Sequence, residues 1–361
     1  MKQAEITIII PVYNTPEKYL RACLQSALSQ TLKEIQIIAI DDGSTDNSGE
    51  VCDEIAAKDN RLTVIHTENA GVSNARNVGI ENAHAPYIIF MDADDYLKSN
   101  ACEKCLSVMN QNTDDIVFFK LVSGVKDSGE YERKGASFIK TMQINIIRHS
   151  DNYAGFVYGS PWGKIFRKEF LDNNNLRFTL GVKRSQDRLF MLYCLEKSST
   201  VGLYHYSGYN YVRNEESICN KYNKNIVSIL DNASNHIGKF VGLYHPNDPA
   251  FKDAMYQLHL KFAFTEMQLF YLNPQCNLGA IAMGKQLKQV FEDEPLRSSI
   301  NHIDLKYCYG KAKVMFVLLK RKQHLLSVVA YKAMNVGVKL RNFLKNNLRS
   351  ILRSLEWKTK S

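Results

Sequence analysis

Residues 87–95 read YIIFMDADD, an apolar run of five residues that ends abruptly at a group of acids. A run of this length and composition predicts a buried strand. Residues two apart in an extended chain point to the same side, so Asp92 and Asp94 converge on one object. Carboxylates gathered in this way repel one another, and a divalent cation, Mn²⁺ or Mg²⁺, relieves the repulsion. A helix N-cap explains one such acid, but not three within four residues.

The rest of the N-terminal third repeats this alternation of apolar runs and helix-patterned stretches. Strand-sized runs lie at residues 6–12, 35–40, 62–65, 87–91 and 116–119. The order predicts an α/β fold with a mostly parallel sheet covered on both faces. Such sheets bind ligands beyond the carboxyl ends of their strands. Polar groups follow the strands at residues 13–14, 41–44, 66–69 and 92–95.

Two of these groups offer chemistry besides a metal site. The acids Asp41 and Asp42 at the end of the second strand suit hydrogen bonding to a base or a ribose. Arg76, on the first turns of the third helix, is placed to pair with Asp41 or Asp92 or to reach a ligand. An ordinary surface arginine is the alternative interpretation of Arg76.

In their order along the chain, these segments resemble the inverting family 2 glycosyltransferases of bacteria. That family has the GT-A fold, a Rossmann-like fold of nucleotide-diphospho-sugar transferases. The matching stretches are IIPVYN at 9–14, QT at 30–31, DDGSTD at 41–46, NAG at 69–71, ARN at 75–77 and FMDADD at 90–95. The resemblance spans residues 5 to 215 and implies a GT-A catalytic domain followed by a C-terminal helical region.

The resemblance also implies roles for individual residues. The nucleobase would lie against Pro11, Val12, Tyr13 and Asp41, and the rest of the nucleotide against Asn69, Arg76, Asp92, Ala93 and Arg213. Asp92-Ala93-Asp94 matches the DxD motif of the family, whose last acid usually reaches the metal. Asp94 is therefore the first choice of ligand for Mn²⁺ or Mg²⁺, with Asp92 second. The implied donor is a nucleotide-sugar, a UDP-sugar.

The catalytic base of the family is the Asp of a Glu-Asp pair that begins a helix, and Asp187 matches it here. This chain has Gln186 in place of the Glu, which puts in doubt what that residue does for acceptor or sugar binding. Trp162 has two interpretations, a platform for a sugar ring or a residue of the core.

Charge is distributed unevenly along the chain. The net charge is +9, yet residues 306–361 hold fourteen Lys and Arg against one acid, Glu356, so the first 305 residues carry −4. In a helix of residues 339–355, the apolar side chains occupy one half and the basic ones mostly the other. This pattern favours an anionic membrane surface. Packing on the catalytic domain or on a second subunit is the alternative, and the acidic body argues against a nucleic-acid partner.

These observations divide the chain into a catalytic domain at 1–219, a helical extension at 220–305 and the basic tail at 306–361. The sequence has no targeting signal and no apolar stretch of about 18 residues that would span a bilayer. We expect a cytoplasmic protein, peripherally associated with the inner face of the membrane. The eight cysteines are scattered, which favours free thiols, and Cys102 and Cys105 are expected on one helix face rather than at a metal.

The predicted activity is that of an inverting, metal-dependent glycosyltransferase, a hexosyltransferase that uses a UDP-sugar. The expected acceptor is a glycan, a lipid-linked saccharide of surface polysaccharide synthesis. A soluble or protein acceptor, with the tail forming a homodimer, is the alternative within the enzyme class. A catalytically idle sugar-nucleotide-binding or scaffold protein is the alternative outside it; Gln186 favours this alternative, while Asp92, Asp94 and Asp187 disfavour it.

Overall fold

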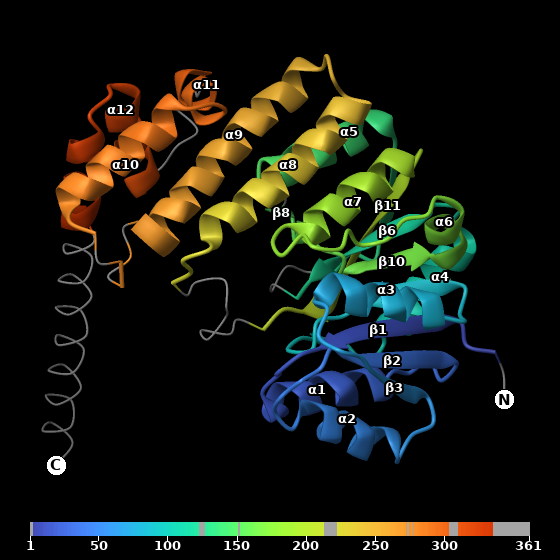
Figure 1. Cartoon of the computed structure of the whole chain (residues 1–361). Coiled ribbons are helices and arrows are strands. Elements are labelled where there is room, and N and C mark those ends of the chain that lie inside the picture. Colours follow the sequence, from blue (N-terminus) through green and yellow to red (C-terminus); the bar gives the residue numbers. More distant parts are fainter. Residues whose placement is uncertain are drawn as a thin grey trace, which may run out of the picture. The chain divides into compact units, whose positions relative to one another are not determined.

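The computed structural model describes residues 3–122, 127–150, 152–212, 222–271, 273, 275–276, 278–302 and 310–334 (Figure 1). The chain forms two compact units. The first contains residues 1–216 and 229–254, and the second contains residues 217–228 and 255–361. Arg213 and residues 335–361, which include the predicted amphipathic helix, lie outside the described residues.

The first unit is built on a nine-stranded sheet. Eight of its strands follow the order β3-β2-β1-β4-β10-β6-β11-β5, and the ninth, β7, pairs with β11. The strands are β1 (Ile6–Val12), β2 (Ile35–Asp41), β3 (Leu62–His66), β4 (Tyr87–Phe90), β5 (Tyr96–Leu97), β6 (Ile116–Leu121), β7 (Tyr131–Lys134), β10 (Lys164–Arg167) and β11 (Val201–Asn210). A separate hairpin pairs β8 (Asn152–Tyr153) with β9 (Phe156–Val157). The predicted strands are therefore confirmed, with ends that differ by one or two residues.

The sheet is parallel where the predicted alternation is clearest and mixed beyond it. Strands β3, β2, β1 and β4 run parallel to one another. Strand β10 enters between β4 and β6 and is antiparallel to both, while β11 is parallel to β6. The parallel order thus covers only part of the sheet, because β10 follows the β8-β9 hairpin rather than a crossover helix.

Helices cover both faces of this sheet, as predicted. The helices of the unit are α1 (Glu17–Leu28), α2 (Ser48–Ala56), α3 (Val72–Asn82), α4 (Ala101–Gln111), α5 (Ala136–Ile147), α6 (Lys168–Asn173) and α7 (Gln186–Lys197). Around β1 to β3, α1 and α2 lie on one face and α3 on the other (Figure 1). Helix α3 approaches β1 closely at Gly79, where a Cβ atom would lie 2.3 Å from Cγ2 of Ile9. Cys102 and Cys105 are buried free thiols on α4, as expected.

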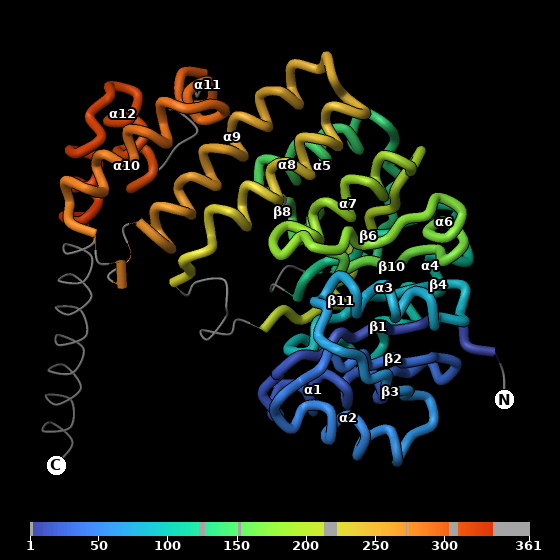
Figure 2. The backbone as a smooth tube through the Cα atoms, in the orientation of Figure 1, coloured from blue at the N-terminus to red at the C-terminus, as the bar shows by residue number. Residues whose placement is uncertain are grey.

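The chain beyond residue 222 is mostly helical in its described parts, as predicted. Helix α8 (Ile226–Tyr244) ends before Pro246, and Pro249 begins α9 (Pro249–Glu266), so both prolines mark the predicted break. The second unit continues with a π-helix (Met267–Tyr271), α10 (Ala280–Glu292), α11 (Leu296–His302) and α12 (Gly310–Lys320) (Figure 2). Its core includes Met283, Leu287, Met315, Phe316 and Val328. Within the described parts of the chain, no helix is both long enough and apolar enough to cross a membrane.

Candidate active site

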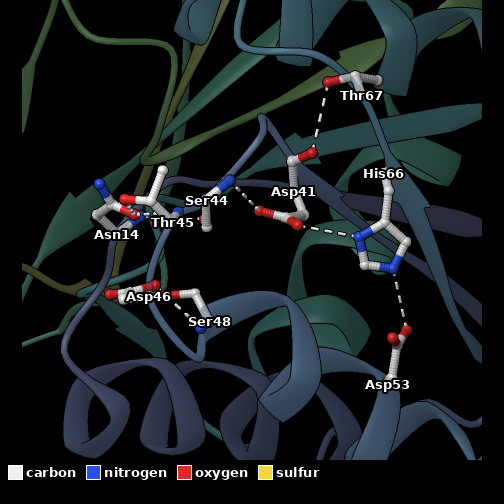
Figure 3. Close-up of polar contacts among 9 residues, drawn as sticks. All are labelled: Asn14, Asp41, Ser44, Thr45, Asp46, Ser48, Asp53, His66 and Thr67. Atoms are coloured by element: carbon white, nitrogen blue, oxygen red, sulfur yellow. Dashed lines mark hydrogen bonds and ion pairs between the residues drawn. The ribbon is translucent and has the colours of Figure 1, made fainter.

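The loops after β1, β2 and β3 meet at the carboxyl edge of the parallel strands. The side-chain oxygen of Asn14 accepts a hydrogen bond of 2.8 Å from the backbone N–H of Thr45, and Ser44 Oγ accepts one from the N–H of Asn14 (Figure 3). The N–H of Thr67 donates to the backbone oxygen of Asp41 at 2.9 Å. Asn14 has φ of 43°, a left-handed conformation that turns the chain sharply out of β1. These bonds hold the three loops together as one surface.

Asp41 is buried at the centre of this surface. Its Oδ1 accepts a hydrogen bond from the N–H of Ser44 at 3.0 Å, and its Oδ2 lies 2.9 Å from His66 Nδ1. Burial raises the pKa of Asp41, but the hydrogen bonds from Ser44 and His66 outweigh it, and the pKa is lowered overall. Asp41 therefore stays ionised and acts only as an acceptor.

The neighbouring Asp42 has a different task. Its two carboxylate oxygens accept the N–H groups of Ala70 and Gly71 at 2.9 and 2.8 Å. Asp42 thus fixes the loop that contains Asn69, and both of its carboxylate oxygens already accept hydrogen bonds from the protein backbone. Asn69 and Tyr13 are exposed beside it, and Tyr13 has 47% of its surface accessible. Pro11 is half-buried and Val12 is buried at the end of β1.

Arg76 reaches the acids that follow β4. Its Nη2 lies 2.8 Å from Asp92 Oδ1, which selects one of the two pairings that the sequence left open. The guanidinium carbon lies 5.1 Å from the centroid of the Phe178 ring. Arg76 is 4% exposed, and its Nε and Nη1 have no hydrogen-bond partner among the described residues. Buried N–H groups without an acceptor destabilise the folded protein unless a ligand accepts their hydrogen bonds.

The three acids after β4 are not equivalent. Asp95 is buried and accepts hydrogen bonds from the Tyr209 hydroxyl at 2.7 Å and from the N–H of Val212 at 2.8 Å. Burial, followed by the charge of Asp92, raises the pKa of Asp95 to about 8. The Tyr209 hydroxyl in turn accepts the N–H of Asp92 at 3.1 Å. Asp95 therefore ties the acidic loop to β11, a role that the sequence did not reveal.

Asp94 and Asp92 remain as candidate metal ligands. Burial and then the charge of Asp92 raise the pKa of Asp94, and the positive charge of Arg76 is paired with Asp92 rather than with Asp94. Among the described residues, no three His, Cys, Asp or Glu side chains gather closely enough to hold a metal ion. Two carboxylates fit a hard cation that completes its coordination with phosphate oxygens and water.

Asp187 lies in the first turn of α7. Its Oδ1 accepts the N–H of Arg188 at 2.9 Å. Burial raises the pKa of Asp187, against the opposing charges of Arg188 and Arg76. Ser185, just before the helix, has φ of 61°, and Gln186 beside it is half-buried. The charges of Arg76 and Asp92 both act on Asp187, so residues from α3, the loop after β4 and α7 belong to one electrostatic site.

Trp162 stacks on two tyrosines of the end of β11 and its following loop. Its ring centroid lies 5.0 Å from that of Tyr209 and 5.6 Å from that of Tyr211. Sequence reasoning missed Lys164, which is fully buried and donates to the backbone oxygens of Val157, Ser160 and Trp162. The only available signal was a lysine inside an apolar stretch, and such a lysine is also typical of a strand end.

In sequence, the chain is similar to known glycosyltransferases. The profile of Glycosyl transferase family 2 matches residues 7–174. Putative glycosyltransferase EpsH of Bacillus subtilis is 31% identical over 230 residues, which cover 63% of this chain and 66% of EpsH. Across the first three curated relatives, the chain spans between 26% and 66% of their length.

Solved structures share the fold. The crystal structure of S. aureus TarS 1–349 in complex with UDP-GlcNAc has a TM-score of 0.63 and 18% identity, and the match covers 92% of each chain. Mannosyltransferase PcManGT from Pyrobaculum calidifontis, in complex with GDP-Man and Mn²⁺, has a TM-score of 0.50 and 14% identity, with 93% of this chain and 88% of that chain covered. The expected α/β GT-A architecture with a helical C-terminal region is confirmed, and residues 7–174 of the chain belong to Glycosyl transferase family 2.

Proposed function

We propose that this chain is an inverting glycosyltransferase that moves a sugar from a UDP-sugar to a hydroxyl of a glycan acceptor. The observation that carries the proposal is the pairing of Arg76 with Asp92 at the strand edge that also holds Asp94 and Asp41, with the charges of Arg76 and Asp92 acting on the pKa of Asp187. The unused N–H groups of a buried arginine can donate to a diphosphate, and a partly desolvated carboxylate can act as a general base.

Donor binding would divide between two parts of the edge. Tyr13 would lie along the base, Asp41 would accept its N–H, and Asn69 would lie beside the nucleoside. The unused Nε and Nη1 of Arg76 would donate to the diphosphate. The family resemblance also assigns Ala93 and Arg213 to the nucleotide, and Arg213 lies outside the described residues. TarS is described in complex with UDP-GlcNAc, which supports UDP as the nucleotide.

Asp94 and Asp92 would hold Mn²⁺ or Mg²⁺. Such an ion supplies positive charge to a departing diphosphate. The Mn²⁺ complex of the mannosyltransferase supports this proposal. Arg76 adds fixed positive charge at the same place and keeps Asp92 oriented.

Asp187 would act as the general base. Its carboxylate takes the proton of the acceptor hydroxyl while the hydroxyl oxygen bonds to the anomeric carbon. The bond from that carbon to the diphosphate oxygen breaks, and its electron pair leaves with UDP. One displacement inverts the anomeric centre. Trp162, with Tyr211, and Gln186 would contact the sugar or the acceptor, which we propose is a lipid-linked saccharide.

Asp94→Asn tests the metal and the activity together. With 1 mM MnCl₂ and a panel of UDP-sugars, we expect the wild-type chain to release UDP and the variant to be about 100-fold slower, the scale of losing a key electrostatic group. Excess EDTA should abolish wild-type activity, and added Mn²⁺ should restore it. Asp231→Asn, an acid on α8, is the matched control. Tight UDP binding without turnover of any donor would instead support the idle sugar-nucleotide-binding protein.

We also propose that the C-terminal region binds an anionic membrane surface on the cytoplasmic side. Residues 310–334 contain six Lys and Arg and no acid. In the helix of residues 324–334, Leu325, Leu326 and Val329 each have about half of their surface exposed. Apolar side chains flanked by lysines are expected at the headgroup boundary.

Full-length chain should therefore sediment with vesicles that contain phosphatidylglycerol and not with neutral phosphatidylcholine vesicles. Leu325→Glu combined with Val329→Glu should lower the bound fraction at least several-fold, because carboxylates would enter the lipid interface. Ser327, which is buried, is left unchanged so that the fold is kept. Equal sedimentation of variant and wild type would overturn membrane binding by this face, and a dimer lost in the variant would assign it to self-association.

A further inference from the structure

His66 lies between two carboxylates at the end of β3. Its Nδ1 is 2.9 Å from Asp41 Oδ2, and its Nε2 is 3.2 Å from Asp53 Oδ1 on α2 (Figure 3). Asp41 is buried, whereas the side chains of His66 and Asp53 are about half exposed. The histidine thus connects Asp41, the buried acid of the proposed nucleobase site, to Asp53, an acid at the surface.

Both contacts are hydrogen bonds in only one protonation state. An ionised carboxylate can only accept, and a neutral imidazole carries one N–H. The two bonds therefore exist together when both ring nitrogens are protonated, that is, in the imidazolium form. The hydrogen bond to Asp41, followed by that to Asp53, raises the pKa of His66 above its ordinary value of 6.5. Asp41 and Asp53 are the charged groups that face the ring, from β2 and α2.

The Asp41 carboxylate is held in one orientation by this arrangement. Ser44 donates to Oδ1 and His66 to Oδ2. Helix α2 packs closely against Oδ2 at Gly49, where a Cβ atom would lie 2.7 Å from Asp41 Oδ2 and 3.4 Å from His66 Cε1. Only glycine leaves room for the pair. Of the donors to this carboxylate, His66 is the one whose proton count changes near neutral pH.

We propose that His66 is a positioning residue for nucleobase recognition, which orients the Asp41 carboxylate and makes nucleotide affinity depend on pH. This inference rests on the proposed function, in which Asp41 accepts the N–H of the base. Because the raised pKa belongs to a histidine, both bonds are present at low pH, and one of them is lost as pH rises through the titration of His66. When the proton leaves, the ring keeps at most one of its two bonds.

The test is calorimetric binding of UDP to full-length wild type and His66→Gln from pH 5.5 to 8.5. The ratio of the two dissociation constants removes the ionisation of UDP itself, which is common to both. We expect His66→Gln to bind about tenfold more weakly at pH 5.5, the scale of a charged hydrogen bond, and this ratio to fall as pH rises to 8.5, where the neutral ring holds at most one carboxylate. His84→Gln, a change at an exposed histidine before β4, should give a ratio of one throughout.

Two further variants separate orientation from loss of a ring. Asp53→Asn should move the midpoint of the pH dependence to lower pH and keep the affinity at pH 5.5, because the bond to Asp41 remains. Gly49→Ala should weaken UDP binding at every pH by displacing the carboxylate. Gly242→Ala, at an open helical position, is its control.

A pH-independent ratio for His66→Gln and an unshifted midpoint for Asp53→Asn, beside UDP binding by the wild type, would overturn this inference alone. Absence of UDP binding by the folded wild type would overturn the proposed function, and the inference with it. Should His66→Gln not fold, Asp53→Asn and Gly49→Ala decide the outcome by the same titration.

Discussion

Asp187→Asn is expected to lower kcat for sugar transfer by about 1,000-fold, within the range attributed to a general base. The amide cannot take the proton of the acceptor hydroxyl, so the oxygen would attack the anomeric carbon as a poor nucleophile. UDP affinity should stay within about twofold, because the nucleotide contacts assigned above do not include this side chain. Parallel measurement of UDP release and of UDP binding by calorimetry separates the two effects.

The fold should tolerate this substitution. Asp187 Oδ1 accepts the N–H of Arg188 in the first turn of α7, and the Asn oxygen can accept the same bond. Asp187→Glu keeps the carboxylate but moves it by one methylene, so we expect partial activity. Retention of more than about a tenth of the wild-type kcat in Asp187→Asn would place the base on another residue. Gln186→Glu, assayed in the same way, measures how much the change from the family's Glu to Gln alters kcat.

Local pattern was enough to predict the strands and the carboxyl edge. Each strand from β1 to β4 is a short, nearly uninterrupted apolar run bounded by polar residues, so its limits are visible without a partner. The pairing of Arg76 with Asp92 was one of two predicted choices, because both acids follow parallel strands. Local pattern did not predict the antiparallel entry of β10, which depends on the path of the chain after the short hairpin.

Functions of individual acids were harder to predict than their location. Asp41 and Asp42 look alike in the sequence, yet Asp42 binds the N–H groups of Ala70 and Gly71, 28 and 29 residues away. Asp94 and Asp95 also look alike, but Asp95 is bound by Tyr209, which lies 114 residues away. These partners are distant in sequence and depend on register within the sheet. The site residues assigned from the family resemblance stay predictions until the substitutions above are measured.

Lys164→Met is expected to lower the free energy of unfolding of the first unit by about 3 kcal/mol, because an ammonium is replaced by a group that cannot donate. The fully buried Nζ of Lys164 donates to three backbone oxygens of the segment 157–162 and lies 4.6 Å from the centroid of the Phe118 ring. Methionine fills a similar volume but leaves those oxygens without this donor. Thermal unfolding should shift down by roughly 6 to 12 °C.

The same substitution should also disturb the aromatic group at the proposed acceptor side, because Lys164 holds the backbone oxygen of Trp162. The chain has two tryptophans, so in a Trp357→Phe background the fluorescence reports Trp162 alone. We expect a red-shifted emission and a higher KM for the acceptor, with UDP affinity unchanged. Lys168→Met is the matched control, because that lysine makes a partly exposed ion pair with Asp172 and should contribute less than about 1 kcal/mol. Equal unfolding temperatures for the two variants would contradict this prediction. They would show that the free energy of desolvating the buried Lys164 ammonium is as large as the stabilisation from its hydrogen bonds.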